Sequence, residues 1–491
     1  MTLRIGRLYH RAHVSHPLNA PAAIVLAAGQ GTRMRSRIPK VLHPLAGRPM
    51  LDHVLAALAE AGVTSPVVVT GHGADAVEAA IADRATTRRQ VPQRGTADAV
   101  RIGLDAVPSD AAIVLVTMGD VPLQPGALYR DLVDALTADG AAIALVAARV
   151  QDPAGYGRLV RDADGNVTAI VEERDADEAT RAIAEINAGT YAFDAAWLRS
   201  AIERVTPSAS GELYLTDLVA VAVAGGRAVR RVTASSDDTM GINDRVHLAV
   251  AEERLRRRIA ETHQRNGVTI VDPSTTRIDA GVEIGQDARI EPWTILEGST
   301  LIAEDAVIGP NAQVRDSRIG PRTSVWASVV ESSTVAEDVQ IGPYAHLRPG
   351  SEIGARCRIG NFAEVKRSRV GADTQQHHFS YLGDAEIGAG VNIGAGVVTV
   401  NYDGTSKHRT EVGDGAFIGS DSMLIAPIVI GEGAMTGAGS VVNRDVAPGK
   451  RVVGVPARPI ELKRRSSSRP PAEASEPGTP APAPSGADRN S

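Results

Sequence analysis

Short apolar runs alternate with amphipathic segments along residues 22–245. The runs are Ala23–Leu26, Pro66–Val69, Ile113–Val116 and Ala142–Val146. Runs that are apolar throughout are typical of strands buried on both faces of a sheet. Helical patterns lie between them, for example at Met50–Ala61 and Ala127–Ala138. This alternation predicts an α/β doubly wound domain with a mostly parallel sheet.

A six-residue period replaces this pattern from about residue 267. The repeated aliphatic positions are Ile278, Ile284 and Ile290; Val335, Ile341, Leu347, Ile353, Ile359 and Val365; Ile387 and Ile393; and Val412, Ile418, Leu424 and Ile430. Glycine often follows, as in Ile341-Gly342 and Ile418-Gly419. A hexapeptide repeat of this length predicts a parallel β-helix, in which each short strand turns one aliphatic side chain inward.

The repeat is interrupted twice, between Val370 and Ile387 and between Val400 and Val412. We expect both stretches to loop outward from the coil, and such loops often carry function. The first contains His377 and His378, and the second contains residues 401–407.

The chain has 491 residues, too many for one ordinary core. Arg, Glu and Ala dominate residues 244–265, where apolar positions near helical spacing predict a connecting helix. Residues after about 463 are rich in Pro, Ala, Ser and Gly and cannot form a core. The expected organisation is a disordered leader at 1–20, the α/β domain at 22–243, a linker helix at 244–266, the β-helix at 267–462 and a disordered tail at 463–491.

Composition narrows the classes of partner. Lys+Arg number 52 against 58 Asp+Glu, so the chain has no basic footprint for nucleic acid. Cys357 is the only cysteine, which excludes an intrachain disulfide and a cysteine-based zinc site. No run of about 18 apolar residues predicts a membrane span. Residues 1–20 lack the apolar stretch of a signal peptide. We therefore expect a cytoplasmic protein.

The loop after the first predicted strand reads Leu26-Ala27-Ala28-Gly29-Gln30-Gly31-Thr32-Arg33. Ligands of open α/β sheets bind at the carboxyl ends of strands, and small residues let backbone N–H groups approach a phosphate or base. The loop is not a Walker A motif, because no Gly-Lys-Ser/Thr follows. It also lacks the third glycine of the dinucleotide motif. On its own it fits many nucleotide sites.

Neighbouring charges make the hypothesis more specific. Arg33 and Lys40 can neutralise a triphosphate, one as a fork and the other as a point charge. Asp120 follows the apolar run ending at Val116, where a carboxylate is well placed for Mg²⁺. The competing interpretation of Asp120 is an ordinary loop or cap residue.

The β-helix carries its own candidate chemistry. Hexapeptide coils serve both as acyltransferases and as inert spacers. Acetyl transfer to an amine needs a base that is partly neutral near pH 7, which suits histidine. Adjacent residues in an extended segment point opposite ways, so we expect one of His377 and His378 to face a site. Arg348 and Lys366 are 18 positions apart, which predicts that they stack as a phosphate clamp.

Together, these motifs resemble the sugar-1-phosphate nucleotidyltransferases. With the hexapeptide half included, residues 22–455 are similar to the bacterial bifunctional N-acetylglucosamine-1-phosphate uridyltransferase and glucosamine-1-phosphate acetyltransferase family. The resemblance implies a nucleotidyltransferase domain followed by a left-handed parallel β-helix. It implies acetylation of glucosamine-1-phosphate by acetyl-CoA, then transfer of UMP from UTP to N-acetylglucosamine-1-phosphate with release of pyrophosphate, a supply for peptidoglycan synthesis. It also implies Mg²⁺ and a homotrimer with acetyl-transfer sites between neighbouring β-helices.

The resemblance assigns roles in the N-terminal half. The residues it implies for nucleotide binding are Leu26, Ala27, Ala28, Gly29, Arg33, Lys40, Gln90, Gly95 and Thr96. The residues it implies for Mg²⁺ are Asp120 and Asn243, and the residues for the N-acetylglucosamine moiety are Gly157, Glu172 and Asn187.

The resemblance also assigns roles in the β-helix, with His378 as the catalytic base. Those for glucosamine-1-phosphate are Arg348, Lys366, Tyr381, Asn392 and Lys407, and those for acetyl-CoA are Ala395, Asn401, Tyr402, Ser420 and Ala438. Val455 departs from the family, which has there an arginine that meets the CoA phosphate. Arg451 and Arg458 lie nearby, and the family's aromatic tail segment is missing.

Two alternatives stay open from sequence. The β-helix could be a scaffold for a single nucleotidyltransferase, which would not need His378, Asn392, Asn401-Tyr402 and Lys407. A catalytically dead interaction protein would be expected to lack Arg33, Lys40 or Asp120, and all three are present.

Overall fold

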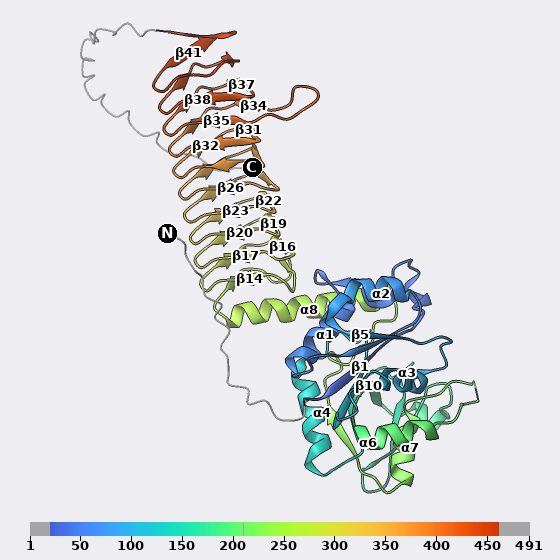
Figure 1. Cartoon of the computed structure of the whole chain (residues 1–491). Coiled ribbons are helices and arrows are strands. Elements are labelled where there is room, and N and C mark those ends of the chain that lie inside the picture. The colour runs from blue at the N-terminus through green and yellow to red at the C-terminus, as the bar shows by residue number, and fades with distance from the viewer. Residues whose placement is uncertain (1–19, 210, 461–491) are drawn as a thin grey trace, which may run out of the picture.

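The computed structural model describes residues 20–209 and 211–460. An α/β domain, a long helix and a β-helix follow one another along the chain (Figure 1). The expected leader, apart from residue 20, and the expected tail lie outside the described residues.

The α/β domain is built on a sheet with the strand order β11-β7-β10-β6-β1-β4-β5. Its strands are β1 (Ala22–Ala27), β4 (Val67–Thr70), β5 (Thr86–Arg89), β6 (Ile113–Met118), β7 (Ile143–Arg149), β10 (Glu185–Asp194) and β11 (Val229–Thr233). Neighbours pair in parallel except around β10, which runs antiparallel to β6 and β7. A hairpin of β8 (Arg158–Arg161) and β9 (Val167–Val171) joins the sheet at β10. The predicted mostly parallel sheet is thus confirmed.

Helices cover both faces of this sheet. They are α1 (Met50–Glu60), α2 (Ala74–Ile81), α3 (Thr96–Leu104), α4 (Gly126–Ala138), α5 (Glu178–Arg181), α6 (Ala195–Ala201) and α7 (Asp217–Ala224), with 3-10 turns η1 (Thr32–Met34), η2 (Lys40–Leu42), η3 (Ala82–Arg84) and η4 (Ile202–Arg204). Ile24 of β1 packs in a core with α3, α6 and α7, whereas its neighbour Val25 packs in a core with α1, α2 and α4. Because successive strand residues point to opposite faces, an apolar run fills both cores.

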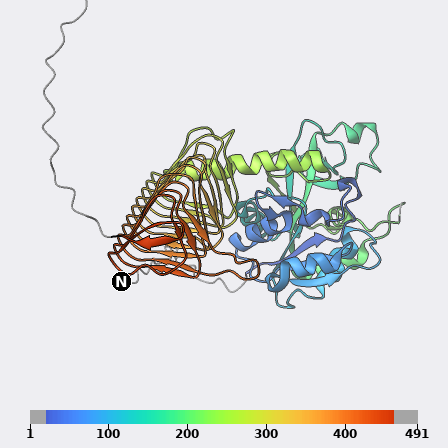
Figure 2. The ribbon, with the colours of Figure 1, turned by 90° about the horizontal axis from the view of Figure 1, so that it is seen from above.

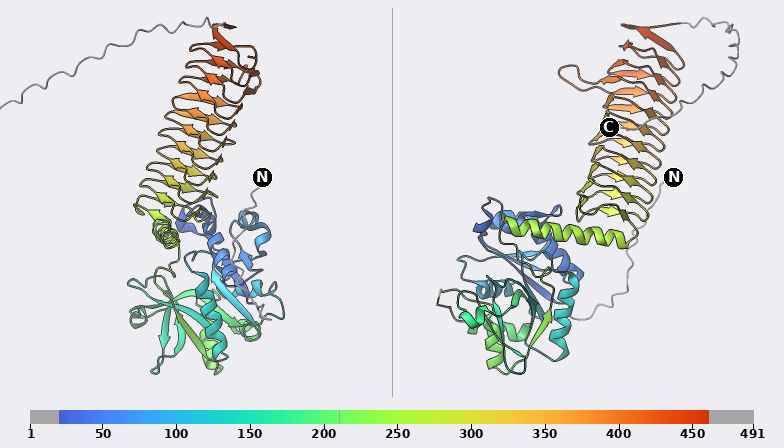
Figure 3. Two further views of the ribbon diagram at one scale, coloured as in Figure 1. Left: turned by 90° about the vertical axis from the view of Figure 1, so that its left-hand side faces the viewer. Right: turned by 180° about the vertical axis from the view of Figure 1, so that it is seen from behind.

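Helix α8 (Arg245–Arg265) connects the two domains. Its N-cap is Asp244, whose side chain accepts hydrogen bonds from the backbone N–H groups of Val246 and His247. It runs between the α/β domain and the base of the β-helix (Figure 3).

Residues 269–459 wind into a left-handed β-helix with three faces, seen end-on in Figure 2. The first face comprises β12 (Thr269–Ile270), β15 (Arg289–Ile290), β18 (Val307–Ile308), β21 (Ser324–Val325), β24 (Gln340–Ile341), β27 (Arg358–Ile359), β30 (Gln375–Gln376), β33 (Asn392–Ile393), β36 (Phe417–Ile418), β39 (Met435–Thr436), β41 (Arg451–Gly454) and β42 (Ala457–Pro459). The second comprises β13 (Arg277–Ile278), β16 (Ile295–Glu297), β19 (Gln313–Arg315), β22 (Val329–Glu331), β25 (His346–Arg348), β28 (Ala363–Lys366), β31 (Ser380–Gly383), β34 (Val398–Val400), β37 (Met423–Ile425) and β40 (Val441–Val442). The third comprises β14 (Glu283–Ile284), β17 (Leu301–Ile302), β20 (Arg318–Ile319), β23 (Thr334–Val335), β26 (Glu352–Ile353), β29 (Arg369–Val370), β32 (Ala385–Ile387), β35 (Thr410–Val412) and β38 (Ile428–Ile430).

The interior of the β-helix consists of stacked aliphatic side chains. On the first face Ile290, Ile308, Val325, Ile341 and Ile359 are consecutive register partners, and all are buried. The six-residue period is therefore confirmed as the inward position of each strand.

The first expected outward loop is wrong. Val370 and Ile387 are register partners on adjacent coils, so the residues between them form an ordinary coil. The repeat is hidden because fully buried Gln376 occupies the inward position between Ile359 and Ile393. Its amide is accommodated because Nε2 donates to Ser380 Oγ at 2.9 Å.

The second expected loop is present. The chain leaves the coil after Val400 and returns at Thr410, and the intervening residues project from the side of the β-helix near β34 (Figure 1). Within the loop, Asp403 accepts hydrogen bonds from the backbone N–H groups of Thr405 and Ser406 and lies against His408. These bonds hold the pKa of the Asp403 carboxyl well below its usual range.

Candidate functional site

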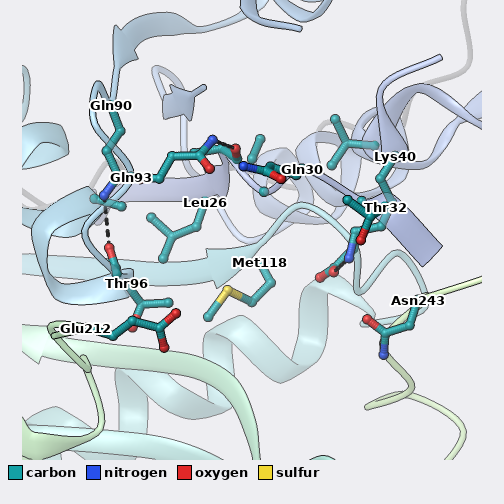
Figure 4. Close-up of a pocket in the computed structure, with 18 of the residues that line it drawn as sticks. Leu26, Gln30, Thr32, Lys40, Gln90, Gln93, Thr96, Met118, Glu212 and Asn243 are labelled. Carbon is teal, nitrogen blue, oxygen red and sulfur yellow. Dashed lines mark hydrogen bonds and ion pairs between the residues drawn. The ribbon is translucent and has the colours of Figure 1, made fainter. Parts of the chain in front are cut away.

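A pocket of about 650 Å³ opens at the carboxyl ends of the central strands β1 and β6. Its lining includes every residue expected at the nucleotide and the metal: Leu26, Ala27, Ala28, Gly29, Arg33, Lys40, Gln90, Gly95, Thr96, Asp120 and Asn243. Figure 4 shows Lys40, Thr32 and Asn243 at one side of this pocket, Gln90 and Thr96 at the other, and Met118 between them. Residues that are far apart in sequence thus meet around one cavity.

The side of the pocket where phosphates are expected contains two cation–oxygen pairs. Lys40 forms an ion pair with Asp120, and Arg33 Nη2 donates to Asn243 Oδ1 at 2.8 Å. The Ile242 N–H donates to the Asp120 carbonyl at 2.9 Å, which joins the two segments. Each expected phosphate cation is therefore paired with one expected metal ligand.

Asp120 and Asn243, the expected Mg²⁺ ligands, both offer oxygen donor atoms to the pocket. Mg²⁺ prefers oxygen, takes one or two protein carboxylates and completes its shell with water and substrate phosphates. The carboxylate and amide oxygens of this pair fit that preference. Nowhere in residues 20–209 and 211–460 do three or more His, Cys, Asp or Glu side chains form a metal cage. An ion held here would therefore depend on the substrate for further ligands.

The far side of the pocket is shaped by buried polar groups. Gln90 is 3% exposed, and its Nε2 donates to the Gly95 carbonyl and to Asp98 Oδ2, each at 2.9 Å. Thr96 Oγ1 accepts from the Leu215 N–H at 2.9 Å. A Cβ at Gly95 would overlap the backbone of Leu213, so this close approach requires glycine. These bonds fix the orientation of the Gln90 and Thr96 side chains in the pocket.

A second pocket of about 280 Å³ continues from the first, and both are lined by Thr96, Met118, Asp120, Tyr214 and Asn243. It contains the three residues expected at the sugar, Gly157, Glu172 and Asn187. Glu172 Oε1 accepts from the Thr216 hydroxyl at 3.0 Å, and Asn187 Nδ2 donates to the Tyr191 hydroxyl at 2.7 Å. Burial raises the pKa of Glu172, and the Thr216 hydrogen bond opposes that rise.

Several lining residues were not found from sequence. Gln93 donates to the Ala28 carbonyl of the glycine-rich loop, and the side chains of Arg174 and Glu212 lie 3.6 Å apart at the pocket rim. These residues belong to exposed loops without a recognisable pattern. Gln93 lies close to Gln90, and that proximity was the only signal available.

On the β-helix, two of the expected cations lie on the second face, and a third approaches them from the outward loop. Arg348 and Lys366 are register partners, which confirms the spacing argument. Glu364 forms an ion pair with Arg348 at 2.7 Å and is the register partner of Tyr381. The Lys407 ammonium, followed by the Arg348 guanidinium, lowers the pKa of Lys366. The outward loop thus returns Lys407 to the Arg348–Lys366 pair.

The expected base and three expected acetyl-CoA residues share one corner of the coil. Gln376, Ile393, Ile418 and Thr436 are consecutive register partners, and each of the four lies two positions before one of the corner residues His378, Ala395, Ser420 and Ala438. Hydrogen bonds link these corners, from the Gly396 N–H to the Phe379 carbonyl and from the Gly439 N–H to the Ser420 carbonyl. Ala395, Ser420 and Ala438 therefore form a column along this corner, and His378 lies on the coil that precedes them.

The remaining expected residues are more scattered. Asn401 is buried, and its Nδ2 donates to Asp384, whereas Tyr402 is exposed on the loop. Asn392 lies on the first face, between its register partners Gln375 and Phe417, and its strand does not contain the cation group. His377 and His378 lie between β30 and β31 and are both exposed, and the chain bends from His378 onward, so the expected extended segment is wrong. The alternating side-chain directions of a strand therefore do not decide which of the two histidines faces a site.

Comparison with known proteins agrees with both halves. Residues 22–239 match the nucleotidyl transferase family, and residues 332–367 and 409–444 match the bacterial transferase hexapeptide family. The chain is 47% identical to the bifunctional protein GlmU of Thermobifida fusca, over 93% of this chain and 97% of that protein. It is 46% identical to bifunctional protein GlmU from Heliobacterium modesticaldum, over 88% and 94% of the two chains, and from Mycolicibacterium vanbaalenii, over 90% and 92%.

The chain belongs to the GlmU family. Its two domains carry the two GlmU activities, uridyl transfer in the nucleotidyltransferase domain and acetyl transfer in the hexapeptide β-helix. The described helices include none that is both long and apolar enough to cross a bilayer.

Proposed function

We propose that the chain converts glucosamine-1-phosphate and acetyl-CoA to N-acetylglucosamine-1-phosphate at the β-helix, and then converts that product and UTP to UDP-N-acetylglucosamine in the α/β domain. The observation that supports this most is the joining of two pockets by shared residues, with Asp120 and Asn243 lining both. A nucleoside triphosphate in one pocket and a sugar phosphate in the other would meet at these residues.

For uridyl transfer, an oxygen of the sugar phosphate attacks the α-phosphorus of UTP. A new P–O bond forms while the bond to the bridging oxygen breaks, and pyrophosphate leaves. The phosphate is already a competent nucleophile, so positioning and charge neutralisation supply the rate. Arg33 and Lys40 neutralise the phosphates, Gln90 and Thr96 orient the base, and Glu172 and Asn187 orient the sugar.

Asp120 and Asn243 would hold Mg²⁺, which when bound neutralises charge on the phosphate oxygens. Their present partners, Lys40 and Arg33, are then available to the triphosphate.

For acetyl transfer, His378 removes a proton from the ammonium of glucosamine-1-phosphate. The amine then attacks the thioester carbonyl, a C–N bond forms and CoA leaves as the thiolate, which takes up a proton. Arg348, Lys366 and Lys407 hold the phosphate, with Tyr381 and Asn392 as further contacts. Ala395, Asn401, Tyr402, Ser420 and Ala438 line the acetyl-CoA side. The metabolites UTP and acetyl-CoA favour a cytoplasmic location.

A homotrimer is the proposed assembly. Its support is an exposed aromatic column at the corner that carries His378, formed by Tyr344, Phe362 and Phe379, which each lie three positions after one of the consecutive register partners Ile341, Ile359 and Gln376. These side chains are 56–62% exposed, and the rings of Tyr344 and Phe362 stack at 5.4 Å. Contiguous exposed aromatics favour an interface.

Two variants test the proposed sites. Asp120→Ala should lower uridyl transfer about a hundredfold or more and leave acetyl transfer intact. His378→Ala should lower acetyl transfer by about a hundredfold or more and leave uridyl transfer intact. Both half-reactions are assayed on each variant, with Asp131→Ala and His377→Ala as controls. Loss of neither activity, or of both in each variant, would contradict the assignment.

A further inference from the structure

A β-hairpin of the α/β domain is clamped between α8 and the first coil of the β-helix. Strands β2 (Pro44–Leu45) and β3 (Arg48–Pro49) are joined by Ala46 and Gly47, which both have positive φ. The Ala46 N–H donates to Glu252 of α8 at 2.8 Å, and the Ala46 carbonyl accepts from the Ala280 N–H of the β-helix at 3.0 Å. One turn residue is therefore bonded to both neighbours.

Asp279 holds this turn from the side of the β-helix. Asp279 is 8% exposed. One of its carboxylate oxygens accepts a hydrogen bond from Arg256 Nη2 at 3.1 Å, and the other accepts one from the Gly298 N–H at 3.1 Å. Arg256 in turn donates to Glu252 at 2.6 Å. A Cβ at Gly47 would overlap the Asp279 carboxylate, so the backbone of the turn lies directly against that carboxylate.

The hairpin continues directly from the segment that carries Lys40. Lys40 begins η2, and β2 starts two residues after η2 ends. Leu45 of β2 is fully buried in an apolar cluster with Met50, Leu123, Ile242 and Ala251. Ile242 precedes Asn243 and bonds through its N–H to the Asp120 carbonyl. A shift of the hairpin would therefore be transmitted to Lys40 and to its partner Asp120, because packed interiors do not absorb displacement.

We propose that Asp279 is a positioning residue for uridyl transfer, and that it acts by fixing the β2–β3 turn and, through this hairpin, the position of Lys40. The inference rests on the proposed role of Lys40 at the triphosphate. It implies that the first coil of the β-helix completes the uridyl-transfer site, although it contributes no side chain to the nucleotide pocket. Small misplacements of a catalytic group cost rate strongly, by up to about a hundredfold for 1 Å.

The first test compares single variants of the full-length protein. Asp279→Ala should lower kcat of uridyl transfer about tenfold, with KM for N-acetylglucosamine-1-phosphate within about twofold. Asp279→Asn should lose less, because its amide oxygen still accepts from Gly298. Asp316→Asn is the matched control, since Asp316 accepts from the Ser299 N–H at 3.0 Å at the same corner and its described hydrogen bonds do not reach the hairpin. Acetyl transfer should be unchanged in every variant, which reports an intact β-helix.

The second test separates positioning from loss of structure. If Asp279 acts through Lys40, then Asp279→Ala should cost little further rate in a Lys40→Ala background, whereas independent defects would multiply. If Asp279→Ala keeps wild-type uridyl transfer while Lys40→Ala is impaired, the inference about Asp279 is overturned and the proposed role of Lys40 stands. Multiplied losses would overturn it as well. Normal uridyl transfer in Lys40→Ala would overturn the proposed role of Lys40 and the inference with it.

Discussion

Arg348 and Lys366 lie side by side on the outer surface of the β-helix, as register partners on β25 and β28. Their numbers differ by 18 because one full coil separates them. Two positive charges are therefore adjacent, and the Glu364 carboxylate forms an ion pair with Arg348 at 2.7 Å. An anionic ligand can neutralise the other, which is what a sugar phosphate would supply.

Removing one of these cations should weaken phosphate binding. Arg348→Ala should raise KM for glucosamine-1-phosphate about tenfold or more, because a charge-assisted hydrogen bond is lost. Arg315→Ala is a suitable control, since Arg315 lies on the same face and pairs with Glu297 at 2.8 Å outside the site. Steady-state acetyl transfer with varied glucosamine-1-phosphate measures the effect, and equal KM values for the two variants would contradict a phosphate role.

The pH dependence of that binding should carry the signature of Lys366. Lys407 and Arg348 lower the Lys366 pKa, so its charge is lost as pH rises through a value below that of an ordinary lysine. KM for glucosamine-1-phosphate should therefore rise early on the alkaline side. Lys407→Met removes the main cause, so this rise should move to higher pH. Lys450→Met, at an exposed position away from the group, should not move the alkaline limb, and no shift in Lys407→Met would count against the coupling.

Protonation of Glu172 should weaken sugar binding at low pH and so give the pH profile of KM an acid limb. Burial raises its pKa, so as pH falls the carboxylate is protonated earlier than an ordinary glutamate. KM for N-acetylglucosamine-1-phosphate in uridyl transfer should rise as pH falls through that raised pKa. Glu172→Gln should weaken binding and abolish this limb. In the neighbouring Glu173, the Arg158 hydrogen bond lowers the pKa, so Glu173→Gln should retain the limb. An unchanged limb in Glu172→Gln would exclude Glu172 as its source.

Gln376→Leu should separate stability from catalysis. The Gln376 amide is buried among aliphatic residues, and its Oε1 has no hydrogen-bond partner among the described residues. Leucine has a similar size, so the free energy of unfolding should rise or change by less than about 1 kcal/mol. Ser380 bonds both to Gln376 and to the His378 carbonyl, so acetyl transfer should fall while uridyl transfer is kept. Denaturant unfolding and both assays measure this; a large loss of stability or full acetyl transfer would contradict it.

The sequence by itself determined the two architectures, and it singled out the glycine-rich loop, Lys40 and Asp120, which line one pocket. Apolar runs that fill two cores, and a six-residue period with one inward aliphatic, leave few alternative folds. Asp120 could be placed at a ligand-binding edge because strands of a parallel sheet end together. The period did not reveal the coil between Val370 and Ile387, because its inward position is the polar Gln376, and periodicity registers hydrophobicity but not the hydrogen bond that permits burial.

Tertiary structure alone decided which separate segments touch. It returned Lys407 to Lys366 from an irregular loop, whose path no repeat specifies. It left Asn392 on a different face from Arg348, because spacing predicts neighbours along one face and not across a corner. It also set Asp279 of the β-helix against Gly47 of the other domain. Such contacts depend on how complete elements dock, which local propensity and period do not encode.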